Sequence, residues 1–251
     1  MDYKRLLNVA LNIGSEMIIS GAEIARVEDT IKRICFAYNT EDIDVFTITS
    51  SIVATIKYDG NIHTQTKRVY EQKIDLDKLD KLNSLSRYIC KNSPSIEYIE
   101  DVYKACLNNG QYCLIMQSLI YFFIAFNLTI FGGGSLQDAV VSGVLGIIMR
   151  LLLICFKILG TSTLINMFLA FIIGSLAVIA IKFNLGNNVD KIIVGDIMLM
   201  IPGAAFTNSI RDMITGDTMS GMLRFIEAMI TAVAIAVGFV IATVYIGGLI
   251  L

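Results

Sequence analysis

The chain has 251 residues, of which 55% are hydrophobic, and its mean hydropathy is +0.67. Only 17% of the residues are charged, whereas a soluble protein of this size carries about a quarter. The formal net charge of −2 creates no large field, so nothing indicates a nucleic-acid partner. Most charged residues lie before Gly110 and the long apolar runs lie after it. This asymmetry predicts a soluble domain, residues 1–110, followed by a membrane domain, residues 111–251.

The cysteines and the single histidine give no sign of a metal site. The five cysteines form no C-x-x-C pair, and His63 has no ligand motif beside it. We therefore expect no metal or other cofactor, reduced thiols, and a structural or exposed His63. No continuous apolar segment follows Met1, so we expect no cleavable signal peptide and a first domain that stays in the cytoplasm.

The first hundred residues predict a small α+β domain. Apolar residues at helical spacing predict helices over 3–20 and 23–38, with Ser20 as a cap of the second helix and Glu23 closing a capping box. The period then changes to two, which predicts three strands with a hairpin turn at Asp59-Gly60. Two further helices are expected before residue 110. The strands are expected over 42–49, 51–58 and 61–69, and the last two helices over 76–90 and 95–107.

The second half predicts a multi-pass α-helical membrane protein. Its apolar segments are long enough for about five transmembrane helices, expected over 111–131, 136–154, 161–181, 192–208 and 219–251. The last segment is longer than one crossing needs, so the count is least certain there. A cytoplasmic first domain agrees weakly with the positive-inside rule. The inner ends would then hold Arg150, Lys157, Arg211 and Arg224, and the outer ends Lys182 and Lys191.

A polar stretch, residues 201–217, interrupts this apolar half. Pro202 removes a backbone donor and Gly203 follows it, so the fourth span is expected to break and present backbone groups to a substrate, or to kink for packing. The candidate substrate-binding residues are Pro202, Gly203, Thr207, Asn208, Arg211 and Asp212. Asn208 and Asp212 are four apart and share a helix face. Arg211 either holds a substrate carboxylate, or snorkels to the interface and pairs with Asp212, Asp217 or Glu227.

Several acidic residues also lie within the apolar segments. An acid in hydrocarbon is protonated or paired, which makes Asp196 the first candidate for proton coupling and Glu227 the second. Glu227 and Arg224 are three apart and are equally consistent with an intrahelical pair. Asp138 is expected at a solvated helix end.

In the first domain, Glu23, Arg26, Glu28 and Asp29 crowd one helix start. A solvated charged face is the usual explanation, and a ligand-sensing or hydrolase-like domain anchored by the spans is the alternative. The chain has neither a G-x-S-x-G sequence nor a Walker A sequence, so we expect no enzyme.

The order of motifs along the chain resembles a known family. The motifs are Ser20-Gly21-Ala22-Glu23-x-x-Arg26-Val27-Glu28-Asp29-Thr30, Asp42-Ile43-Asp44-Val45-Phe46, Pro202-Gly203, Asn208-Ser209-Ile210-Arg211-Asp212 and Gly216-Asp217. They are similar to those of the threonine/serine exporter (ThrE) family, and most similar to the larger, YjjP-like subunit of its split form.

The resemblance implies a proton-driven exporter of threonine and serine, or of small dicarboxylates such as succinate, in the bacterial cytoplasmic (inner) membrane. Fused members carry a second membrane domain that this sequence lacks, so the resemblance implies a separate small membrane subunit and a homo- or hetero-oligomer in lipid. A passive channel is a third hypothesis, beside the exporter and the ligand-sensing domain anchored by the spans.

Overall fold

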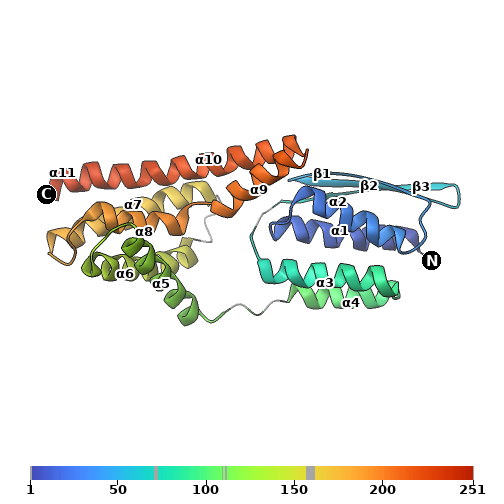
Figure 1. Cartoon of the computed structure of the whole chain (residues 1–251), viewed down its shortest axis with the longest axis horizontal. Coiled ribbons are helices and arrows are strands. Elements are labelled where there is room, and N and C mark those ends of the chain that lie inside the picture. The colour runs from blue at the N-terminus through green and yellow to red at the C-terminus, as the bar shows by residue number, and fades with distance from the viewer. Residues whose placement is uncertain (1, 71–72, 109, 111, 157–161, 251) are drawn as a thin grey trace. The chain divides into compact units, whose positions relative to one another are not determined.

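The computed structural model describes residues 2–70, 73–108, 110, 112–156 and 162–250 (Figure 1). The protein is helix-rich and carries one small sheet near its N-terminus. It divides into two compact units, Met1–Gly110 with Ala204–Ile226, and Gln111–Gly203 with Glu227–Leu251. The segment Ala204–Ile226 thus packs with the N-terminal residues, although the sequence assigned it to the membrane half.

The helices and strands predicted for the first hundred residues are confirmed in kind and order. Their bounds are α1 (Tyr3–Ile19), α2 (Ile24–Phe36), β1 (Asp42–Ile48), β2 (Ser51–Tyr58), β3 (Asn61–Arg68), α3 (Leu76–Asn92) and α4 (Ile96–Leu107). The strands form an antiparallel sheet in the order β1-β2-β3. Asp59 and Gly60 both have positive φ, 48° and 73°, as the predicted tight hairpin turn requires.

The first unit is layered. Helices α1 and α2 pack on one face of the sheet, and α3 and α4 pack on the other side of these two helices (Figure 1). The period-two pattern explains the sheet side of the core, because alternate residues point to one face. Those of β1 and β2 are buried against the helices, namely Ile43, Val45, Ile52, Ala54 and Ile56.

The capping box predicted at Ser20 and Glu23 is wrong. Ser20 is instead the C-cap of α1, and the chain leaves that helix through Gly21, whose φ is +96°. The N–H of Ala22 donates to the Met17 carbonyl, which closes α1 in the manner of a Schellman motif. Glu23 is the N-cap of α2, and its side chain makes no capping hydrogen bond. The sequence signal was ambiguous because a Ser-Gly pair suits a helix end as well as a helix start.

The second unit is built from apolar helices. Four helices in the described residues are long and apolar enough to cross a membrane: Leu114–Phe131, Leu136–Phe156, Thr163–Lys182 and Thr218–Ile246. They correspond to α5 (Leu114–Phe131), α6 (Leu136–Phe156), α7 (Ser162–Lys182), and α10 (Thr218–Ile241) with the π-helical turn η2 (Ala242–Ile246); α11 (Gly247–Ile250) follows.

The fourth of the five predicted spans is divided between two short helices. Residues 192–208 fall in α8 (Val189–Met200) and α9 (Gly203–Ile214), each of 12 residues. Neither reaches the roughly 20 residues that a single crossing needs, so the count of five is not confirmed. Lys157, used to orient the chain, lies outside the described residues, and the cytoplasmic side of the first unit stays a prediction.

Candidate functional site

The helix break expected at Pro202 is present. Helix α8 ends at Met200, and Ile201 is extended, with φ −61° and ψ 129°. Pro202 has no N–H to offer, and α9 begins directly after it. Pro202 is half-buried, whereas Gly203 and Thr207 are exposed. The break therefore separates two helices at the point where the chain passes from one unit to the other.

The polar face of α9 docks on the turn that joins α1 to α2. The Asn208 side-chain amide donates to the Gly21 carbonyl at 2.9 Å. One turn later the Arg211 guanidinium donates to the Glu23 carboxylate at 2.7 Å, in a pair whose arginine side chain is 59% exposed. Arg211 thus pairs neither with Asp212 nor with Asp217 or Glu227, the partners that the sequence suggested. These contacts use two of the predicted substrate-binding side chains within the first unit.

Asp212 completes this docking surface and is itself fully buried. One carboxylate oxygen accepts the backbone N–H of Ile24, the first residue of α2, at 3.2 Å, and so supplies the cap that Glu23 does not. The other oxygen accepts from the Arg224 guanidinium at 2.8 Å. Burial raises the pKa of Asp212 and outweighs the opposite effects of the Arg224 charge and the Ile24 N–H.

Arg224 was not predicted as a site residue, although it forms an ion pair with Asp212. It is buried, with 3% of its side chain exposed, and pairs with Asp212, so it is not engaged in the intrahelical pair with Glu227. Its Nε and Nη2 have no hydrogen-bond partner among the described residues. An arginine at the start of an apolar run was a visible signal, because such a charge is expensive to bury without a partner.

The four charged residues at the start of α2 have different contacts and do not form one cluster. Glu23 binds Arg211, as above, and Glu28 accepts the backbone N–H of Thr47 at 2.8 Å. Burial raises the pKa of Glu28, and the nearby charge of Asp217 acts in the same direction. Arg26 and Asp29 are both exposed and line a separate groove. These residues therefore do not form one catalytic centre.

In the second unit, Asp196 lies in the interior of the apolar helices. It is 0% exposed, and one carboxylate oxygen accepts from the Ser142 hydroxyl at 3.0 Å. The other oxygen has no partner among the described residues. The sequence analysis did not identify Ser142, on α6, as a donor to Asp196. An unpaired acid in such surroundings is costly unless a proton or an ion neutralises it.

Glu227, the second candidate for proton coupling, has a different environment. It is exposed on α10 and forms no ion pair within the part of the chain that the structure describes. Nothing in its surroundings brings it together with Asp196.

The expectation that Asp138 lies at a solvated helix end is wrong. It is 1% exposed and accepts the backbone N–H groups of Asn187 and Asn188 at 2.6 and 3.0 Å, as well as the hydroxyl of Ser135. Asp138 thus ties the start of α6 to the loop before α8, and this structural role accounts for its burial.

Gly195 sets the close approach of α8 to its neighbours beside Asp196. A Cβ added there would lie 2.7 Å from the Ser142 hydroxyl and 2.9 Å from the Ala125 carbonyl, and would also collide with the Thr129 hydroxyl. We expect Gly195→Ala to destabilise the protein by about 1–3 kcal/mol, because the Ala125 carbonyl belongs to the backbone and cannot rotate aside as a side chain can. The measurement is the midpoint of thermal unfolding in detergent.

Gly247→Ala is the matched control for this substitution, because a Cβ at Gly247 would meet no atom within 4 Å. Equal midpoints for the two variants would show that α8 does not pack as closely as described.

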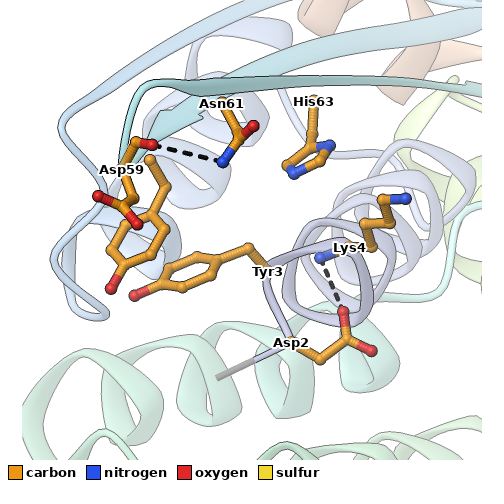
Figure 2. Close-up of a pocket in the computed structure, with 7 residues that line it drawn as sticks. Asp2, Tyr3, Lys4, Asp59, Asn61 and His63 are labelled. Atoms are coloured by element: carbon orange, nitrogen blue, oxygen red, sulfur yellow. Dashed lines mark hydrogen bonds between the residues drawn. The ribbon is translucent and has the colours of Figure 1, made fainter.

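A cavity of about 570 Å³ near the N-terminus includes His63 (Figure 2). The rings of Tyr3 and Tyr58 stack in it with centroids 3.6 Å apart, and the Asn61 amide donates to the Asp59 carbonyl. Figure 2 shows His63 beside Asn61 on β3, with no carboxylate among the drawn residues bonded to its ring. No hydrogen bond joins His63 to another lining residue of this cavity among the described residues, so the cavity does not form a catalytic constellation.

Comparison with known proteins gives one match. A family model described as "Putative threonine/serine exporter" (ThrE) matches residues 8–245, nearly the whole chain. No curated protein and no solved structure matches it. The matched range contains the α1–α2 turn, the broken helix pair α8–α9 and Asp196.

Proposed function

Because this chain belongs to the threonine/serine exporter family, we propose that it is a subunit of a proton-driven exporter of threonine and serine, or of small dicarboxylates such as succinate. The observation that best supports this proposal is the burial of the Asp196 carboxylate. The carboxylate lies inside the apolar helices, and one of its oxygens has no hydrogen-bond partner among the described residues. An acid is costly in such a place and is therefore kept for ion or proton movement. In the proposal Asp196 takes up the coupling proton, and Glu227 is the second candidate.

The proposed substrate path follows the helix break. Pro202, Gly203 and Thr207 lie at the end of α8 and the start of α9, where an interrupted helix offers backbone groups to a polar solute. Asn208, Arg211 and Asp212 continue the set. Their contacts with the Gly21–Ile24 turn support a link between substrate binding and the first unit.

The partner is proposed from the family's split form. A small membrane subunit would supply the second membrane domain, and the two would assemble in the bacterial inner membrane as a hetero-oligomer with the first unit in the cytoplasm.

The test is transport by inverted membrane vesicles that carry this chain and the small membrane subunit. Labelled serine, threonine and succinate are offered under an imposed proton gradient, and accumulation of at least one is expected. Accumulation of none would overturn the proposal. Solute movement that is insensitive to an uncoupler would instead identify a passive channel.

Arg211→Ala tests the proposed substrate set. We expect transport to fall at least about tenfold, because a charge-assisted bond to the substrate carboxylate is lost. Insertion should be unaffected, since the exposed pair with Glu23 contributes no more than about 1 kcal/mol. Uptake into the same vesicles and the amount of inserted protein are both measured.

Arg5→Ala is the control, because Arg5 forms comparable exposed pairs with Glu97 and Glu100. If Arg211→Ala and Arg5→Ala transport equally well, Arg211 serves only its surface pair.

A second candidate function is a ligand-sensing domain anchored by the spans. It is favoured by a groove in the first unit that contains Arg26 and Asp29 of the charged motif. A vesicle assay without transport, together with ligand binding at that groove, would favour this candidate over the exporter.

A further inference from the structure

A groove between α2 and α3 of the first unit is lined by three arginine residues. Its volume is about 200 Å³. We call it the arginine groove and define it by the side chains of Arg26, Asp29, Arg33, Asn83, Ser86 and Arg87. No residue of the candidate membrane spans lines it.

The two helices contribute matching stripes. Arg26, Asp29 and Arg33 are spaced i, i+3 and i+7 on α2. Asn83 and Ser86, followed by Cys90, have the same spacing on α3. Residues at this spacing lie on one face of a helix, so each helix presents a polar stripe to the groove.

The groove holds more positive than negative charge. The Arg33 Nε lies 2.7 Å from an Asp29 carboxylate oxygen, which neutralises that pair. Arg26 and Arg87 have no ion pair or hydrogen bond among the described residues, although the chain as a whole is acidic, with a net charge of −2. Arg26 and Arg87 therefore leave two positive charges at the groove that no carboxylate among the described residues pairs with, and both would attract a bound anion.

One neutral group of the groove suits the same kind of ligand. The Asn83 side-chain amide can donate an N–H, whereas the Ser86 hydroxyl already donates its hydrogen to the Asn83 carbonyl at 2.8 Å. Guanidinium groups present planar pairs of N–H donors that match the oxygens of phosphate and carboxylate groups. The lining therefore offers donors from both helices to one small anion.

We propose that the arginine groove binds a small, doubly charged oxyanion, with Arg26 and Arg87 as its two principal donors. The shared chemistry is that of a phosphate group or a dicarboxylate. The ligand would bind within the first unit, since every lining residue lies on α2 or α3. The groove shares no lining residue with the surroundings described for Asp196 or with the helix break.

Cys90 offers a direct reporter, because its exposed thiol lines the same groove. The full chain is purified in detergent with the other exposed cysteines, Cys113 and Cys155, replaced by serine; Cys35 and Cys106 are buried. The rate of Cys90 labelling by a maleimide is then measured at pH 8 against rising inorganic phosphate, with chloride at equal ionic strength as the reference. We expect saturable slowing by phosphate and none by chloride.

The variants Arg26→Gln and Arg87→Gln each remove one donor. Each should weaken phosphate binding about tenfold, the usual effect of losing one hydrogen bond to a charged group. Lys91→Gln is the matched control, since it removes one positive charge from α3 outside the groove. The affinity of the Lys91→Gln variant for phosphate should stay within about twofold of that of the unsubstituted chain, because an exposed charge is largely screened.

Four further outcomes decide the proposal. Slowing by succinate in place of phosphate supports the site and assigns it to dicarboxylates. Slowing only by phosphatidate mixed into the micelle overturns a soluble ligand and assigns the groove to a lipid headgroup. Equal slowing by phosphate and chloride, or equal effects of Arg87→Gln and Lys91→Gln, overturns the proposal altogether. None of these readouts needs transport, so they remain decisive if the exporter proposal fails.

Discussion

Asp196→Asn is expected to lower proton-driven accumulation of substrate in inverted vesicles by at least about tenfold, because the residue can no longer take up or release a proton. The amide has almost the same shape and can still accept the Ser142 hydroxyl, so the packing around it should persist. Exchange of labelled for unlabelled substrate, which needs no net proton movement, should survive in this variant. Accumulation and exchange are measured in the same vesicles.

Ser142→Ala is the control for this experiment. It removes the hydrogen bond to Asp196 and leaves the carboxylate in place, so it should keep proton-driven accumulation. If Asp196→Asn accumulates substrate at the wild-type level, Asp196 does not couple proton movement to transport. Glu227 would then be the remaining candidate. Loss of both accumulation and exchange in the variant would indicate a structural role for Asp196.

Asp212→Asn and Arg224→Gln are each expected to destabilise the protein by about 3–5 kcal/mol, because each leaves a buried charge without its partner. The double variant should be more stable than either single variant, since it buries no unpaired charge. Denaturant or thermal unfolding in detergent, followed by the helical circular-dichroism signal, gives the midpoints of all three.

The control is Glu23→Gln, which weakens the exposed pair with Arg211 and should shift the midpoint little, by no more than about 1 kcal/mol. If the double variant is as unstable as the sum of the single variants, the two residues act independently and the pair is not the source of their effect.

The first unit shows which features a single sequence can predict. Its helices and strands follow from local signals: apolar spacing in α1 and α2, alternation in β1 and β2, and the Asp59-Gly60 turn. These signals act over a few residues, so no knowledge of the tertiary structure is needed. The break at Pro202 was predictable for the same reason.

The contacts of the candidate site were not predictable in this way. The acceptor for the Ile24 N–H is Asp212, which lies 188 residues later in the chain. Asp138 was misjudged because its partners, Asn187 and Asn188, come from a distant loop. Such pairings depend on how helices pack, and the local pattern around each residue contains no information about its partner.

The segment Ala204–Ile226 lies within residues 111–251, which composition predicts to be the membrane domain. In the structure its polar side chains bind the α1–α2 turn, and it clusters with the first unit. Composition indicates how apolar a segment is and does not indicate which part of the protein it packs with.

The cap that α2 receives from Asp212 has a consequence for dissecting the protein. A fragment that stops at Gly110 would lack that carboxylate, and the Ile24 N–H would be left to water at the helix start. The first unit is discontinuous in the chain, so a faithful excised version would need Ala204–Ile226 grafted back through an artificial linker. A fragment that is to keep this cap must therefore include Asp212.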